Sequence, residues 1–347
     1  FCPRFIIDQE ISGNIGNKLA GREVMIISTS FPPLSRDELA MRNFLIARAA
    51  KDNGADRVIL LEPDLFYSAQ DRGPRLEHGF TDYDRSPEDF GKFDGQPFSA
   101  RLYAELLKQA GVDEVVTVHN HSTSVEKIFL DRFSGKFHNL KPADVYASYL
   151  RDSDIVGLDR LMLCAPDKGA AGYVNEVRDA LDLESIHVLN LCKERRDERD
   201  VEIGLSSAST AQLSDIEGKD VVIMDDMVRT GTTIIESCNF IRRYSPRRIL
   251  FFVTHFYSSR EGRINMNDSV IDEIVATSSI PAILNRDMQG RLRHKLVVLR
   301  ISRWISSYIL QMIDPQSEGL RVPLYNEDMS SKNPRWRGTM GPLFSGQ

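Results

Sequence analysis

Short apolar runs alternate with longer amphipathic segments along most of the chain. The runs are rich in Val, Ile and Leu, which is typical of buried strands, and the segments between them repeat apolar residues at helical spacing. The predicted strands are 23–29, 56–62, 114–120, 160–166, 186–192, 220–226 and 248–255, and the predicted helices are 37–54, 99–111, 173–181 and 233–244. Continuous apolar strands separated by helices favour an α/β fold with a parallel sheet covered on both faces.

The same succession of strand, helix, strand and polar loop occurs twice. It predicts two similar domains, each a mainly parallel sheet flanked by helices, at 1–153 and 154–313. From residue 314 the chain becomes polar and is interrupted by Pro and Gly, so 314–347 is predicted to be a tail on the surface, with Trp336 and Phe344 as possible anchors.

Length and composition exclude several classes of protein. The 347 residues suit two domains of ordinary size, and the net charge of -6 argues against a dedicated nucleic-acid binder. No apolar stretch approaches the roughly 20 residues that a membrane span needs. The four cysteines show neither a Cys-x-x-Cys pair nor zinc spacing, so we expect reduced thiols and a cytoplasmic protein.

The stretch VVIMDDMVRTGTT contains the first candidate site. Asp225 and Asp226 end a predicted strand, and ligands of open parallel sheets bind at the carboxyl ends of strands. A hydroxyl-rich turn follows where the next helix begins, and helix N-termini attract phosphate. The residues of this turn are Thr230, Gly231, Thr232 and Thr233. The alternative, a threonine N-cap at an ordinary junction, explains neither the aspartate pair nor the three threonines. We therefore expect a sugar-phosphate site.

This stretch resembles the phosphoribosyl-pyrophosphate (PRPP) binding loop of the type I phosphoribosyltransferase fold. Its neighbours narrow the resemblance to the ribose-phosphate pyrophosphokinase, or PRPP synthase, family, over nearly all of residues 5–312. The matching segments, in order, are STSFPPLSRDELAMRNFLI, LFYSAQDR, QPFSARLYAELLKQAGVDEVVTVHNHS, CAPDKGAAGYV, CKERR, DDMVRTGTT and NDSVIDEIVATSSIP.

The resemblance implies a chemistry and a set of partners. Members of the family transfer the diphosphoryl group of ATP to the 1-hydroxyl of ribose 5-phosphate, which gives PRPP and AMP. They use Mg²⁺, place the active site at the junction of the two domains, and assemble as homo-oligomers, a hexamer built from dimers. For this chain we therefore expect ATP and ribose 5-phosphate as substrates and a dimer or a hexamer.

The resemblance also assigns catalytic residues. His121 matches the histidine beside the ATP phosphates and Asp167 the metal-associated aspartate, so the two are the expected metal ligands. Lys193 and Arg195 match the basic pair of the catalytic loop, where cations stabilise the charge that develops during transfer. Taken alone, His121 is an ordinary strand-end histidine, Asp167 a turn residue, and KERRDERD a solvated run of charges.

Five further residues match nucleotide contacts. Gln70, Asp71 and Arg72 correspond to the family's Gln-Asp-Arg segment. Asp8 and Glu10 resemble the acidic loop that reaches adenine from an adjacent subunit, although an extra residue disturbs the Phe-x-Asp-x-Glu spacing.

The chain departs from the family on the nucleotide side. Ala69 stands in place of an arginine, and His119 in place of an aspartate. Two histidines at 119 and 121 of a strand would share a face and offer a transition-metal site as an alternative to magnesium. The segment 73–95 is longer than the family's connection, and long loops are often lids or binding loops.

The acceptor loop departs as well, because Arg229 replaces an acidic residue and Thr232 a second glycine. Three alternatives to an ordinary PRPP synthase therefore stay open. One is a phosphoribosyltransferase that consumes PRPP, another is a regulatory or weakly active paralogue that co-assembles with an active synthase, and the third is a synthase with an unusual nucleotide or sugar phosphate.

Overall fold

A computed structural model of the chain describes residues 4–8, 10–14, 19–30, 33–81, 84–120, 122–183, 185–195, 201–317 and 323–337. The chain divides into two compact units, Phe1–Lys141 and Pro142–Gln347. Each unit has a hydrophobic core of its own, built from buried strand and helix residues.

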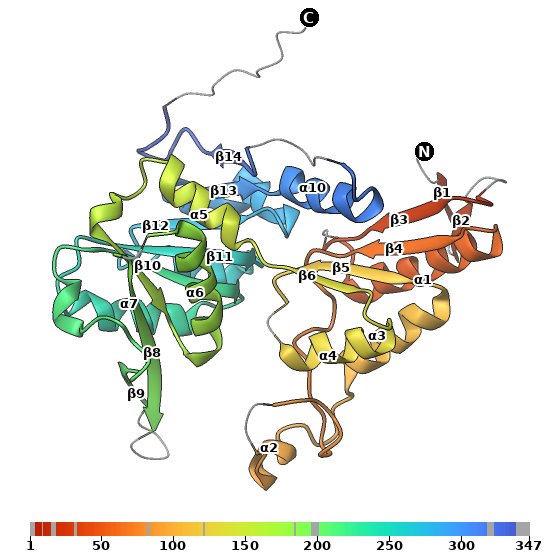
Figure 1. Cartoon of the computed structure of the whole chain (residues 1–347), viewed down its shortest axis with the longest axis horizontal. Helices are drawn as coiled ribbons and strands as arrows, with labels where there is room; N and C mark the ends of the chain where they lie inside the picture. Colours follow the sequence, from red (N-terminus) through yellow and green to blue (C-terminus); the bar gives the residue numbers. More distant parts are fainter. Residues whose placement is uncertain are drawn as a thin grey trace, which may run out of the picture. The chain divides into compact units, whose positions relative to one another are not determined.

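The first unit contains a parallel sheet of four strands, whose order in the sheet is their order along the chain. The strands are β3 (Glu23–Ile27), β4 (Arg57–Leu61), β5 (Glu114–Val118) and β6 (Phe137–Leu140), and the helices between them are α1 (Arg36–Asp52), α3 (Ser99–Ala110) and α4 (Thr123–Arg132). Because successive right-handed crossovers advance in one direction, these helices lie on one face of the sheet, as Figure 1 shows.

Two smaller elements complete the described part of this unit. The strands β1 (Arg4–Asp8) and β2 (Glu10–Asn14) form an antiparallel hairpin. The short helix α2 (Pro87–Gly91) lies in the connection between β4 and α3.

The second unit contains an eight-stranded sheet with the order β14-β13-β12-β11-β10-β7-β8-β9. Its strands are β7 (Leu161–Ala165), β8 (His187–Arg195), β9 (Val201–Leu205), β10 (Asp220–Val228), β11 (Arg248–Phe256), β12 (Glu273–Thr277), β13 (Leu296–Arg300) and β14 (Asn326–Met329). The strands from β13 to β8 are parallel, whereas β9 and β14 pair antiparallel at the two edges.

Helices cover both faces of this sheet. They are α5 (Ala143–Asp152), α6 (Lys168–Leu181), α7 (Thr232–Arg242), α8 (Arg260–Met266), α9 (Arg286–Gln289) and α10 (Ser302–Ile313), with short 3-10 turns at Leu158–Arg160, Leu213–Ile216, Pro281–Leu284 and Gly290–His294. In β11, Phe252 contacts Tyr146 and Tyr149 of α5, whereas the adjacent Phe251 belongs to the core cluster that contains Ile241 of α7. Since neighbouring strand residues point to opposite faces, both faces are buried, and the predicted α/β class is confirmed.

The units divide after Lys141, earlier than the predicted boundary after residue 153. The helix α5 belongs to the second unit because Tyr146 packs against both Tyr173 of α6 and Phe252 of β11. The predicted boundary therefore falls at the end of α5, inside the second unit.

The predicted surface tail is an edge strand over part of its length. The strand β14 pairs with β13 and extends the sheet. Trp336 is 39% exposed, and Phe344 lies outside the described residues.

The anchor of this segment is Arg335, whose side chain is only 16% exposed. Its Nε lies 2.8 and 3.0 Å from the two carboxylate oxygens of Glu273, at the start of β12. Its Nη1 donates to Asp154 at 3.0 Å, and its Nη2 donates to the hydroxyl of Tyr149 at 2.8 Å. One guanidinium thus ties the C-terminal segment to a strand, a helix and a turn of the second unit.

We expect the change Arg335→Met to destabilise the second unit, because it leaves the buried carboxylate of Glu273 without its cation. Breaking such a pair costs about 3 kcal/mol, which lowers the midpoint of thermal unfolding by roughly 6–12 °C. Calorimetry of the variant measures this. Arg337→Met removes an exposed arginine two residues away and is the control. Equal midpoints for the two variants would contradict the role of Arg335.

Candidate active site at the switch point of the second sheet

The strand order of the second unit creates a crevice between β7 and β10. The chain leaves β7 through α6 to β8 on one side, and leaves β10 through α7 to β11 on the other. Ligands of open parallel sheets bind where such connections separate, outside the carboxyl ends of the strands. The parallel sheet of the first unit, as far as the structure describes it, runs in chain order and contains no such point.

Three predicted site residues meet at this crevice. Asp225 and Asp226 lie in β10, and Asp167 lies two residues after the end of the neighbouring strand β7. Asp167 is the N-cap of α6, and its Oδ1 accepts from the amide of Ala170 at 3.1 Å. An Asp225 oxygen accepts from the amide of Asp226 at 2.9 Å. Burial, then the neighbouring Asp226 and then Asp167, raise the pKa of Asp225 well above its usual range.

The threonine turn is not an ordinary cap. The N-cap of α7 is Gly231, in the left-handed conformation with φ 82°, and no side chain caps this helix end. Thr230 and Thr232 are exposed, and Thr233 is half-buried. Because the first amides of a helix have no partner within it, the start of α7 is a place for an anion. The threonine N-cap alternative is wrong.

Helix α8 supports this turn from one side. Ser259 donates its hydroxyl to the carbonyl of Arg229 at 2.8 Å, and Asn265 donates to the carbonyl of Thr230 at 2.9 Å. A Cβ at Gly231 would come within 2.3 Å of the Cε of Met266, so this position requires glycine for its space as well as for its φ. This support was not predicted from the sequence, although Ser259 at the head of a helical stretch is a visible N-cap signal.

Arg229 lies at the same edge of the sheet. Its guanidinium lies over the ring of Tyr257 at 5.2 Å, and the amide of Tyr257 donates to the carbonyl of Val228 at the end of β10. Arg229, which stands where the family has an acidic residue, therefore lies next to the threonine turn.

The predicted basic loop is part of a strand. Backbone pairing of β8 with β9 continues past Cys192, with Lys193 opposite Ile203 and Arg195 opposite Val201. Lys193 and Arg195 thus lie on a two-stranded antiparallel extension of the sheet, because VEIGL returns as a pairing strand after the charged run. Residues 196–200 lie outside the described part of the chain.

Two predicted nucleotide residues of the first unit, Asp71 and Arg72, belong to a hydrogen-bonded network. Gln70 is exposed, whereas Asp71 accepts from the hydroxyl of Ser122 at 2.7 Å and from Nε of Arg72 at 3.3 Å. The turn before them is held by Glu62, a fully buried carboxyl that accepts from the amide of Phe66 at 2.8 Å. Burial raises the pKa of Glu62 to about 8.

The strand predicted at 114–120 is shorter in the structure. The strand β5 ends at Val118, and His119, with a φ of 46°, lies beyond it. His121 lies outside the described residues. Asp8 and Glu10 are paired across the end of the β1–β2 hairpin, in strands rather than in a loop. Within the described residues, no group of three or more His, Cys, Asp or Glu is arranged to hold a metal.

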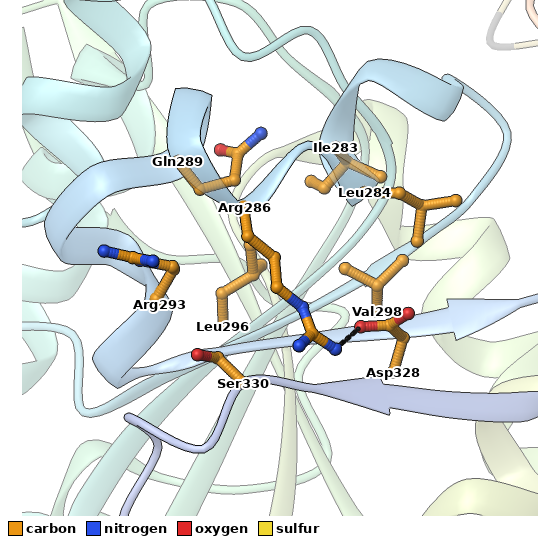
Figure 2. A pocket seen from close by; sticks show the side chains of 9 residues that line it. All are labelled: Ile283, Leu284, Arg286, Gln289, Arg293, Leu296, Val298, Asp328 and Ser330. Carbon is orange, nitrogen blue, oxygen red and sulfur yellow. Dashed lines mark hydrogen bonds and ion pairs between the residues drawn. The ribbon is translucent and has the colours of Figure 1, made fainter.

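Two hollows lie elsewhere in the second unit. A cavity of about 20 Å³, enough for roughly one water, lies between β13, β14 and α9. Figure 2 shows Arg286 reaching toward Asp328 there, among apolar side chains including Leu284 and Val298, with an Nη2–Oδ1 distance of 2.9 Å. A groove of about 610 Å³ lies at the end of α6 and the start of β8, away from the carboxyl ends of the strands. Neither hollow is the crevice.

Comparison with known proteins agrees with this geometry. The family model described as phosphoribosyl transferase domain matches residues 143–284, which include the crevice and the threonine turn. A curated ribose-phosphate pyrophosphokinase of Pyrococcus abyssi is 27% identical over 270 residues, 77% of this chain and 80% of its own length. That of Vibrio parahaemolyticus is 24% identical over 312 residues, 89% and 87% of the two chains.

The chain is similar in sequence to ribose-phosphate pyrophosphokinases over more than three quarters of its length. Its fold is also that of the phosphoribosylpyrophosphate synthetase of Mycobacterium smegmatis, with a TM-score of 0.69 at 20% identity over 90% of each chain. No helix of the described residues has the length and apolar character needed to cross a membrane. The crevice between β7 and β10 lies within the residues that match the phosphoribosyl transferase domain.

We expect Asp225→Asn to make the ligand-free protein more stable at neutral pH. A carboxyl with a raised pKa binds more protons in the folded than in the unfolded chain, so it destabilises the fold increasingly as the pH rises above about 4. Removing this charge should gain about 1 kcal/mol at pH 8, or roughly 2–4 °C in Tm, and little at pH 4. Thermal unfolding of both proteins at the two pH values measures this. A variant that is less stable than the native chain at pH 8 would contradict it.

Proposed function

We propose that this protein is a ribose-phosphate diphosphokinase, which transfers the diphosphoryl group of ATP to the 1-hydroxyl of ribose 5-phosphate and produces PRPP and AMP for nucleotide biosynthesis. The observation that carries the proposal is the crevice between β7 and β10, where a carboxylate pair of β10 is followed closely in the chain by the uncapped start of α7. The names of its relatives support the same reaction.

The acceptor side of the reaction uses the second unit. The 5-phosphate binds the first amides of α7 and the hydroxyls of Thr230, Thr232 and Thr233, with Gly231 allowing close approach. The ribose hydroxyls donate to Asp225 and Asp226, which relieves the crowding of negative charge between these carboxylates. The 1-hydroxyl oxygen then attacks the β-phosphorus in line and its proton is released to water. The bond from that phosphorus to the α,β-bridging oxygen breaks, and AMP leaves with this oxygen.

The donor side is a proposal from the matched residues. Gln70, Asp71 and Arg72, together with Asp8 and Glu10, bind the nucleotide. Lys193 and Arg195 stabilise the charge on the transferred group.

Magnesium fits the carboxylates present, since Mg²⁺ prefers oxygen ligands and commonly takes one or two carboxylates plus substrate phosphates rather than a complete protein cage. The absence of a three-residue cluster within the described residues is compatible with that mode. His121 and Asp167 would hold the ion, which when bound neutralises phosphate charge.

The proposal includes a cytoplasmic protein that forms a dimer or a hexamer and binds neither nucleic acid nor membrane. The free thiols of Cys164, Cys192 and Cys238 support a reducing compartment. The net charge of -6 supports the absence of a nucleic-acid partner.

Incubation of the purified chain with ATP, Mg²⁺ and ribose 5-phosphate tests the proposal. By ³¹P NMR we expect the ATP signals to be replaced by those of AMP and of a sugar carrying both a phosphate and a diphosphate. ADP as the nucleotide product would contradict diphosphoryl transfer. Turnover of PRPP with a nucleobase would instead indicate a phosphoribosyltransferase, and activity that needs an added synthase would indicate a regulatory paralogue.

We expect Asp226→Asn to reduce kcat/KM for ribose 5-phosphate about 100-fold, because ribose loses a charged acceptor that orients its 1-hydroxyl. The control is Asp287→Asn, an exposed aspartate on α9. Steady-state rates at varied ribose 5-phosphate measure the effect. A variant with native kcat/KM would remove Asp226 from the proposed site.

A further inference from the structure

The long connection 73–95 is folded around a buried arginine. The side chain of Arg85 is 2% exposed. Its Nη1 donates to the carbonyls of Arg75 and His78, both at 3.1 Å, and its Nη2 donates to that of Gly73 at 2.8 Å. Its Nε donates to Asp89 of α2 at 2.6 Å. One side chain therefore ties the beginning of the connection to its helix.

The other face of this connection contacts the nucleotide motif. The guanidinium of Arg72 lies 5.1 Å from the centre of the Phe93 ring, and its Nη1 is 3.5 Å from Oδ1 of Asp89. Asp89 thus accepts hydrogen bonds from two arginines, from Arg85 at Oδ2 and from Arg72 at Oδ1. The hydrogen bond from Arg85 lowers the pKa of Asp89 despite burial, so its carboxylate is charged at neutral pH.

Asp71 continues this network to the start of α4. It accepts from Nε of Arg72 at 3.3 Å and from the hydroxyl of Ser122, the N-cap of α4, at 2.7 Å. The hydroxyl of Ser124 donates to the carbonyl of Asp71 at 2.7 Å. The connection, the Gln-Asp-Arg segment and the beginning of α4 therefore form one hydrogen-bonded block.

We propose that Asp89 is a positioning residue for the nucleotide, which it affects by orienting Arg72, and that Arg85 holds Asp89 in place. The inference rests on the proposed function, since it concerns how that reaction binds its donor. An arginine side chain loses much rotamer freedom on ordering. The contacts of Arg72 with the carboxylate of Asp89 and the ring of Phe93 order its side chain before the nucleotide binds. Less conformational entropy is then lost on binding, so the affinity for the nucleotide is higher. The connection 73–95 thereby raises the affinity of this chain for the nucleotide donor.

The decisive variant is Asp89→Asn. The change is isosteric and leaves the three contacts of Arg85 with backbone carbonyls in place, so the connection stays folded. We expect KM for ATP to rise about threefold to tenfold, with KM for ribose 5-phosphate unchanged. Glu88→Gln removes an exposed carboxylate from the same helix and is the matched control, expected to behave as the native chain.

A double-mutant cycle separates positioning from a general structural effect. If Asp89 acts through Arg72, then Asp89→Asn adds nothing to KM for ATP in an Arg72→Gln background, whereas independent effects multiply. A multiplied effect, an unchanged KM, or a lower KM, which would mean that Asp89 competes with ATP for Arg72, would each overturn the inference. A native chain without diphosphokinase activity would instead overturn the proposed function.

Discussion

The repulsion between carboxylates at the carboxyl ends of β7 and β10 is the constraint on which the site depends. Asp225 and Asp226 are consecutive in β10, and Asp167 follows the adjacent strand, so one crevice gathers three acids. Such a group costs stability when it is ionised and empty. It becomes favourable when a ligand supplies hydroxyl donors, and the uncapped start of α7 beside it supplies the complementary place for a phosphate.

In each unit, an irregular segment is fixed by an arginine that is buried with most of its donors in use. Arg335 ties the C-terminal segment to Glu273, Asp154 and Tyr149. Arg85 does the same for the connection that carries α2. A guanidinium presents five donors in a rigid fork, so it can replace the regular hydrogen bonding that such segments lack. The C-terminal segment and the connection that carries α2 both interrupt the alternation of strands and helices, and in both a buried arginine supplies the ordering contacts.

The sequence predicted what depends on local pattern. The apolar runs around Ile223 and Phe251 are parallel strands, and Asp225 lies toward the carboxyl end of the first, although that strand continues to Val228 instead of ending at residue 226. Strands that form only by pairing with a distant segment could not be predicted from the sequence. The strand β8 continues through Lys193 because a later segment pairs with it, and β14 exists because β13 presents an edge. The local composition of a segment does not show which distant segment will pair with it.

The most direct test of the account is a crystal structure of the protein with ribose 5-phosphate alone. The account predicts the phosphate against the amides at the start of α7 and the ribose hydroxyls within hydrogen-bond distance of Asp225 and Asp226. A sugar phosphate bound elsewhere, with the crevice between β7 and β10 holding only water, would contradict it.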